Sequence, residues 1–202
     1  NWRYAVKVFD PNKKISAENL HTILESARLS PSSNGVEMWK FFVIENPEIR
    51  KRLREVGYDQ PKITDASHLI VIAYRTDSAE NLVKERLERT AKIQNKKIEE
   101  LEGLKNMLES GLNKKIKNGT LESWVMSQAY IPLGIMIETA SLLHIDNGPM
   151  EGFDPNKVDE ILGLKEKNLK SVTMLALGYR DEDPASTRPK VRRPFDEVVE
   201  FV

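Results

Sequence analysis

Apolar positions near the start of the chain recur with helical spacing. Leu20, Ile23 and Ala27 fall on one helical face, and Ser16 precedes them at a position typical of an N-cap. The spacing predicts a helix over residues 15–27. It ends in the turn-rich run 30–35, whose proline disfavours helical backbone at the residue before it.

Three short apolar runs, at 41–44, 69–74 and 172–177, are typical of buried strands. They lack polar alternation, which fits strands that are covered on both faces. A helix predicted over 46–56 separates the first two runs. Short strands separated by helices favour an α/β or α+β fold over a helical bundle.

The middle of the chain contains two long helical stretches. Residues 80–118 are rich in Glu and Lys, and Gly103 and Gly111 interrupt them, which predicts two or three amphipathic helices. Residues 123–144 are apolar almost all round, which predicts burial on every side in the core or at a subunit interface. Polar residues and a proline within this stretch argue against a membrane span, which needs about 20 mostly apolar residues.

The last third of the chain contains a well-delimited helix and a proline-rich end. Asp154 as N-cap, Pro155 in the first turn and Gly163 after the end predict a helix over 154–162. From Asp181 onwards, repeated prolines predict an extended arm rather than a helix. Such an arm needs a surface to lie on, and another subunit is one candidate.

Composition and charge narrow the class of protein. The chain has 202 residues, 40% hydrophobic and 31% charged, which suits one domain or at most two small ones. Its 31 basic and 31 acidic residues balance, so neither nucleic acid nor a membrane surface is an expected partner. It contains no cysteine, which excludes disulfides, thiolate metal sites and thiol nucleophiles within it. The sequence opens without a signal-peptide pattern, so we expect a cytoplasmic location.

Few sequence motifs of catalysis are present. Neither standard phosphate-binding glycine loop nor a G-x-S-x-G elbow occurs, and the three histidines lie far apart. Cations are found at both ends instead: Arg3 with Lys7, and Lys190 with Arg192. These four side chains could bind one phosphate, with Arg supplying bidentate geometry, or they could be ordinary surface charge.

Two loops could bring backbone groups close to a ligand. The residues 148–152 contain a Gly-Pro pair and a second glycine, which predicts a tight loop leading into the helix at 154. The loop 31–35 offers hydroxyls and bare amides. Both are equally compatible with plain connections between elements.

In this order, the segments resemble the FMN-dependent nitroreductase family. The resemblance rests on six blocks: R-Y-A-V-K-V-F-D at 3–10, S-P-S-S-N-G-V-E-M-W-K-F at 30–41, D-A-S-H at 65–68, Trp124 with Gln128, P-M-E-G-F-D at 149–154, and R-P-K-V-R-R-P at 188–194. It implies an α+β fold with a central, mostly antiparallel sheet flanked by helices. A single domain would span 1–202, with a helical excursion at 80–120 covering the active site. It also implies an intertwined homodimer with exchanged C-terminal arms and FMN at the interface.

The resemblance also implies which residues bind FMN. Arg3, Lys190 and Arg192 would hold its phosphate, and Lys7 would reach the N1/O2 edge of the ring. The Glu151–Gly152 backbone would face N5, with the Glu151 carboxylate near the nicotinamide or substrate. The expected cofactor-binding residues are Arg3, Tyr4, Ala5, Lys7, Pro31, Ser32, Ser33, Gly35, Asp59, Lys62, Pro149, Glu151, Gly152, Lys190 and Arg192. Glu151 and Lys7 are the two assigned to the chemistry, and no metal is expected.

The activity implied is that of an NAD(P)H-dependent FMN oxidoreductase. Hydride would pass from NADPH or NADH to the flavin, and a nitroaromatic, quinone or similar small electron acceptor would then be reduced in a ping-pong mechanism. One alternative is a flavin-binding redox sensor or FMN store without efficient turnover. Another is a structural dimer without a cofactor.

Five positions depart from the family's common pattern. Ala5 replaces Ser, Gly35 and Glu37 replace Asn and Gln, and Met38 replaces Pro. Asp59 replaces Asn, which would put a negative charge near the flavin ring edge or the nicotinamide. The Gly-x-Glu version of the loop resembles a recognised subgroup of the family.

Overall fold

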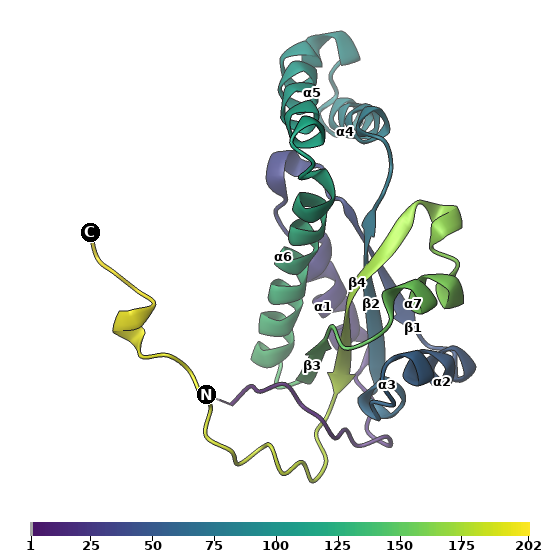
Figure 1. The fold of residues 1–202 in the computed structure, drawn as a ribbon, viewed down its shortest axis with the longest axis vertical. Helices are drawn as coiled ribbons and strands as arrows, with labels where there is room; N and C mark the ends of the chain where they lie inside the picture. Colours follow the sequence, from purple (N-terminus) through teal and green to yellow (C-terminus); the bar gives the residue numbers. More distant parts are fainter. Residues whose placement is uncertain (1) are drawn as a thin grey trace.

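A four-stranded antiparallel sheet forms the centre of the computed structural model, which describes residues 2–202 (Figure 1). The strand order is β1–β2–β4–β3, and each neighbouring pair is antiparallel. The strands are β1 (Trp39–Ile44), β2 (His68–Arg75), β3 (Asp146–Met150) and β4 (Leu169–Gly178). The three predicted strands are confirmed, and β3 is an addition to them.

Both faces of the sheet are covered, which explains why its central strand is apolar throughout. Side chains alternate along a strand, so Ile70 and Ile72 of β2 point to one face while Leu69 and Val71 point to the other. All four side chains are fully buried. The prediction of a strand covered on both sides is therefore confirmed.

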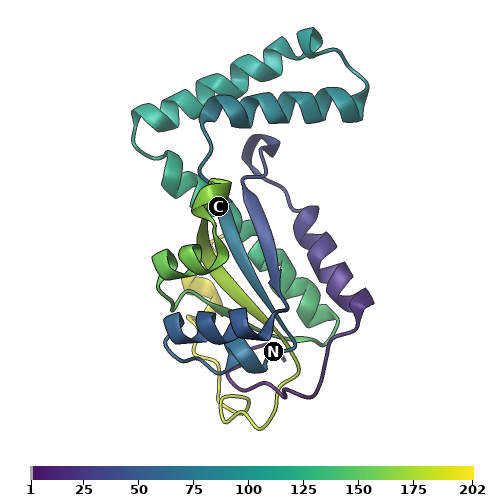
Figure 2. The same ribbon diagram turned by 90° about the vertical axis from the view of Figure 1, so that its right-hand side faces the viewer.

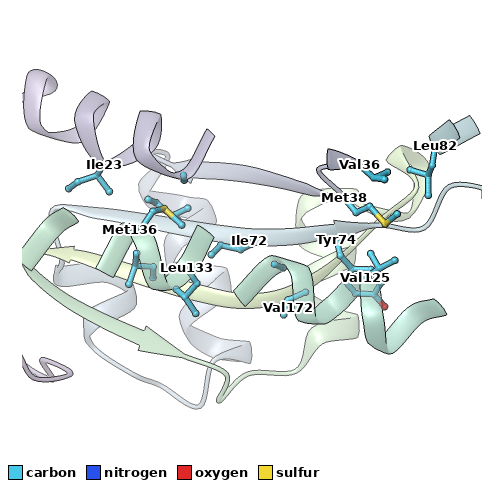
Figure 3. Packing of buried hydrophobic residues seen from close by; sticks show 14 of the residues in the cluster. Ile23, Val36, Met38, Ile72, Tyr74, Leu82, Val125, Leu133, Met136 and Val172 are labelled. Carbon is cyan, nitrogen blue, oxygen red and sulfur yellow. The ribbon is translucent and has the colours of Figure 1, made fainter. Parts of the chain in front are cut away.

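Helices α1 (Ala17–Arg28) and α6 (Leu121–Leu142) cover one face of the sheet. Ser16 caps α1 as predicted, because its hydroxyl accepts a hydrogen bond from the Asn19 N–H at 3.2 Å. Figure 3 shows Ile23 of α1 and Met136 of α6 converging on the sheet.

Helices α2 (Pro47–Val56), α3 (Lys62–Asp65) and α7 (Pro155–Leu162) cover the opposite face. The caps follow the predicted pattern: Asp154 accepts hydrogen bonds from the first-turn N–H groups of α7, and Gly163 ends the helix in the left-handed region.

The excursion consists of α4 (Ala79–Gln94), a short turn at Ile98–Leu101, and α5 (Glu102–Lys117). These helices extend past one end of the sheet (Figure 2). The predicted breaks at Gly103 and Gly111 are wrong, because both glycines lie inside α5. The chain reverses instead at Asn95, whose left-handed backbone caps α4. Buried leucines of α5, which pack into the main core, outweigh the low helix propensity of glycine.

Helix α6 is one continuous helix through Pro132. Burial on every side is wrong for the single chain, because Ser127, Tyr130, Gly134 and Glu138 are exposed. Their spacing of three and four residues places them on one stripe of the helix. None of the helices in residues 2–202 has the length and apolar character required to cross a membrane.

The C-terminal segment is the extended arm that its prolines predict. From Asp181 onwards its only helical part is a short turn at Phe195–Glu197. In Figure 1 this arm, drawn in yellow, leaves the body of the molecule.

Candidate cofactor site

The N-terminal segment lies along the free edge of β3. The Val6 N–H donates to the Asn147 carbonyl at 3.0 Å, and Ala5 forms a parallel bridge with Asn147. Further along, the Asp181 N–H donates to the Val8 carbonyl at 3.2 Å. Residues 5–8 are therefore held between β3 and the beginning of the arm.

Asp183 joins the two ends of the chain. It is only 5% exposed, and its Oδ2 accepts hydrogen bonds from the Lys7 N–H at 2.8 Å and the Tyr4 hydroxyl at 3.1 Å. Burial alone would raise the pKa of Asp183, but these hydrogen bonds and one from the Ala185 N–H outweigh it and lower the pKa. Burial, with the bond to Asp183, raises the pKa of Tyr4 to about 12. Tyr4 thus fixes the arm through Asp183.

The predicted tight loop at 148–152 is wrong in its first half, since Gly148, Pro149 and Met150 belong to β3. Pro is tolerated here because β3 is an edge strand. Gly148 is needed because a Cβ at this position would lie 2.7 Å from the Val6 carbonyl oxygen. The Gly-Pro pair therefore marks a close backbone approach.

Lys62 is a buried cation beside this strand. It is 3% exposed, and its Cδ lies 3.5 Å from where a Gly148 Cβ would be. Within residues 2–202 no carboxylate forms an ion pair with Lys62 or Lys7. Burial, together with the Lys7 charge, lowers the pKa of Lys62 to about 8. Two neighbouring cations without an acid are suited to an anionic or oxygen-rich group.

The Glu151–Gly152 segment, which follows β3, is held by two side chains that the sequence did not single out. The Tyr130 hydroxyl donates to Glu151 Oε1 at 2.9 Å, and Gln60 Nε2 donates to the Gly152 carbonyl at 2.7 Å. Burial and the bond to Glu151 raise the pKa of Tyr130 to about 12, so the phenol keeps its proton and remains a donor. No local pattern identifies Gln60 or Tyr130, because their partners lie 92 and 21 residues away.

Asp59 lies at the surface of the neighbouring turn. Its side chain is 83% exposed, and Oδ1 accepts from Arg54 Nε at 2.6 Å. Asp59 and Tyr58 both have left-handed backbone, with φ of 52° and 55°. The Asp59 carboxylate is thus directed to Arg54, and its expected contact with the flavin ring stays a prediction.

The loop Pro31–Gly35 is fixed at a different place. Gln128 Oε1 of α6 accepts from the Ser33 N–H at 2.8 Å, and the Ser32 hydroxyl accepts from the Glu37 N–H at 3.0 Å. The loop therefore lies beside the N-terminal half of α6, as Figures 1 and 2 show, whereas the N-terminal segment crosses near the other end of the helix.

One chain does not bring all predicted site residues together. Gln128 and Tyr130 are two positions apart in α6. Their side chains are therefore separated by a rotation of about 200° around the helix axis and lie on nearly opposite sides. Gln128 holds the Pro31–Gly35 loop, and Tyr130 holds Glu151. The loop consequently lies on the opposite face of α6 from the residues around Lys62, Glu151 and Gly152, which we call the Lys62–Glu151 region.

The cations of the arm are placed differently from each other. Lys190 lines a pocket of about 360 Å³ with Trp2, Tyr4 and Arg188, next to the N-terminal segment. Arg192 is exposed farther along the arm, where it donates to the carbonyl of Val191. Arg3 is half-buried. The structure thus joins Lys190 to the N-terminal segment, while binding of one phosphate by Arg3, Lys190 and Arg192 stays a prediction.

Comparison with known proteins identifies the family. The model of the nitroreductase family matches residues 1–179. The chain belongs to the nitroreductase family. A Staphylococcus haemolyticus protein assigned as an NAD(P)H nitroreductase is 37% identical over 209 residues, covering 100% of this chain and 94% of that protein. Bacillus subtilis YfkO, with the same assignment, is 38% identical over 212 residues, covering 100% and 95%.

Solved structures of this family share the fold. Bacillus subtilis YdfN, which is assigned as a nitroreductase, superposes with a TM-score of 0.85 at 19% identity, covering 99% of this chain and 95% of that one. A Staphylococcus epidermidis protein assigned as an NAD(P)H:FMN oxidoreductase gives 0.80 at 25% identity, covering 100% and 93%. A protein from Exiguobacterium sibiricum that is assigned as a nitroreductase was solved in complex with FMN. It superposes with a TM-score of 0.80 at 21% identity, covering 99% of this chain and 93% of that one. The predicted α+β fold and family are confirmed.

Proposed function

We propose that this protein binds FMN beside Lys62 and uses NAD(P)H to reduce small electrophilic acceptors, such as nitroaromatics or quinones, in two half-reactions. As a member of the nitroreductase family, it is an NAD(P)H-dependent oxidoreductase, and its cofactor is FMN. The observation that carries the proposal is the buried Lys62 next to Lys7, without a carboxylate partner in residues 2–202. A flavin ring edge, which becomes anionic on reduction, fits this pair of cations.

Each group of residues has one task in this proposal. Lys7 and Lys62 bind the ring edge and stabilise negative charge there. Arg3, Lys190 and Arg192 bind the phosphate, since two guanidinium groups and an ammonium suit its oxygens. The bound cofactor supplies hydride transfer from NAD(P)H and delivery of electrons to the acceptor.

The Glu151–Gly152 segment positions the reacting edge of the ring. Its backbone N–H groups follow an edge strand, and Gln60 and Tyr130 hold it from two sides. Because two anchors restrain this segment, a hydrogen bond from its backbone is already oriented before the ring binds. No side chain acts as a nucleophile in this scheme.

The working unit in this proposal is a homodimer. The Pro31–Gly35 loop and the Lys62 region lie on opposite faces of α6, so a loop from a second copy would complete each site. Two further features support pairing. The exposed stripe of α6 is available for close packing, and Phe195, Val198 and Phe201 of the arm are exposed apolar side chains in the single chain.

The test is a visible absorbance spectrum of the purified protein, recorded before and after anaerobic addition of NADPH or NADH. Bound flavin that bleaches supports the proposal and reveals the preferred nucleotide. Bound flavin that does not bleach with either nucleotide would instead indicate a redox sensor or FMN store. A protein that takes up no FMN would be a structural dimer.

A double variant, Lys190→Ala with Arg192→Ala, tests the phosphate site. It is expected to abolish FMN retention, because both side chains are predicted phosphate ligands. The matched control is Lys92→Ala with Lys96→Ala, two exposed lysines in the last turn of α4 and just after it. Undiminished FMN retention in the arm variant would contradict the phosphate assignment.

A further inference from the structure

Helix α4 presents two arginines to the Pro31–Gly35 loop and to Glu37 just after it. A Cβ on Gly35 would lie 2.8 Å from an Arg86 Nη atom, so the Arg86 guanidinium occupies the space that a side chain at position 35 would need. Arg89 lies beside it, 3.5 Å from the Gly35 carbonyl oxygen and 3.3 Å from the Glu37 carboxylate. Gly35 and Glu37 are two of the five positions that depart from the common family pattern. Each of these departures is therefore matched by an arginine from α4.

The loop is also strained. Asn34, Gly35 and Glu37 all have left-handed backbone, with φ of 60°, 64° and 54°. Non-glycine residues in this region cost about 1–3 kcal/mol each and cluster at ligand-binding positions. The contacts from Gln128, Ser32 and Arg89 hold the backbone in this shape, which indicates that the loop is shaped for a ligand.

The two arginines differ in their partners. Arg89 is paired with Glu37. Arg86 has no ion pair within residues 2–202, and its Nε, like that of Arg89, is buried without a hydrogen-bond acceptor. Its helix offers no acid, because the positions three and four residues away are occupied by Leu82, Val83, Arg89 and Thr90. Leaving a buried charged donor unpaired is costly, and a bound anion would remove that cost.

We propose that Arg86 binds an oxyanion, a phosphate or a carboxylate, on the second ligand of the site, either the nicotinamide nucleotide or the acceptor. This inference rests on the proposed function. The FMN phosphate is a poor candidate, because its predicted cations belong to the two termini. A guanidinium offers a planar pair of donors that matches phosphate and carboxylate oxygens. Arg89 is a positioning residue, which holds the loop through Gly35 and Glu37.

The inference gives the excursion a role in specificity. Because Arg86 belongs to α4, the excursion would select ligands by charge, favouring those with an oxyanion over neutral molecules of the same shape. Losing one charge-assisted hydrogen-bonded contact is expected to weaken binding about 10- to 100-fold.

The test compares Arg86→Met, which keeps the bulk of the side chain, with Arg86→Lys, which keeps its charge. Lys84→Met, an exposed position on α4, is the matched control. KM is measured for NADPH, for NADH, and for two acceptors of the same shape, 4-nitrobenzoate and 4-nitrobenzamide. A rise of KM of about 10- to 100-fold for 4-nitrobenzoate alone would identify the acceptor as the oxyanion source. The same rise for the nucleotides alone would identify their phosphates. Arg86→Lys should recover part of either loss.

A binding measurement separates this inference from the proposed function. Isothermal titration of NADP⁺ and of 4-nitrobenzoate into each variant reports oxyanion binding without turnover. If the parent protein fails to reduce any acceptor, the proposed function fails, and the titration still decides the role of Arg86. Three results would overturn the inference: unchanged binding in Arg86→Met, an equal loss for charged and neutral acceptors, or loss of FMN retention.

Discussion

The two regions of this chain that contain the predicted site residues are built differently. In the Lys62–Glu151 region, Gln60 and Tyr130 hold the backbone and side chain of the loop, and Asp183 fixes the N-terminal segment beside it. The Pro31–Gly35 loop is strained, and its supports come from α6 and from the excursion.

Under the proposed function, the two regions would have different tasks. The Lys62–Glu151 region offers two cations in an environment that the chain itself organises, which suits a cofactor that stays bound. The loop region is shaped by α4, which lies beyond the end of the sheet and carries Arg86. Under the proposed function, a ligand that must enter and leave would bind at this second region, because α4 extends past the end of the sheet.

Replacing Lys62 should affect the first region most strongly. Lys62→Met removes the charge but keeps the length of the side chain. We expect FMN affinity to fall about 10- to 100-fold, since a charge-assisted contact is lost. The apo protein should become more stable, because a buried charge without an acid partner disappears. Flavin fluorescence and thermal unfolding measure the two effects, and a fall in both affinity and stability would contradict this assignment.

Mixed dimers test whether the two regions meet between chains. Lys62→Met damages one region, and Gly35→Val damages the other, because valine is strained at a φ of 64° and would contact Arg86. In a random mixture of the two variants, half of the dimers contain one of each, and half of their sites carry neither change. Activity should therefore recover to about a quarter of the parent value. If each site belonged to a single chain, mixing would restore nothing.

Tyr130→Phe should have a smaller effect on the first region. The change removes the hydroxyl that donates to Glu151 and leaves the ring in place. A hydrogen bond to a charged group contributes about 1.5–3 kcal/mol, and Tyr130 is partly exposed, so we expect about a fivefold loss in kcat/KM. Gln60 still holds Gly152, so FMN should remain bound. The flavin midpoint potential separates a positioning role from a structural one: a shift supports positioning, and an unchanged potential with normal turnover contradicts it.

The elements with local signals were predictable from sequence. The Ser16 cap of α1 and the Asp154, Pro155 and Gly163 punctuation of α7 depend on neighbours within a few residues. Strand β3 was not predictable in this way. Gly148 is required there by the close approach of the Val6 backbone, which is 142 residues away in the chain. The same limit applies to the site.

The resemblance to the family identified Lys7, Lys62 and Glu151 as candidate site residues. It did not identify the residues that surround and hold the two regions. Gln60 and Tyr130 act through partners in other elements, and Arg86 lies against Gly35 of a distant loop. Their immediate sequence neighbourhood shows none of this. In the sequence, Tyr130 cannot be distinguished from the other apolar residues of a long helix. Only the folded chain shows that its hydroxyl faces Glu151.

The pH dependence of the free energy of unfolding is a further test of the Lys62–Glu151 region. Burial and the Lys7 charge hold the pKa of Lys62 at about 8, below its unfolded value of 10.5. Between these two values the unfolded chain binds more protons than the folded one, so the free energy of unfolding of the apo protein should rise as pH increases from about 8 towards 10.5. Below pH 8 the contribution is constant, because Lys62 is protonated in both states. Denaturant unfolding of the parent and of Lys62→Met across this range isolates the effect as the difference between the two curves. Parallel curves would mean that Lys62 is solvated like a surface lysine, and the first region would then lose the feature that distinguishes it from the second.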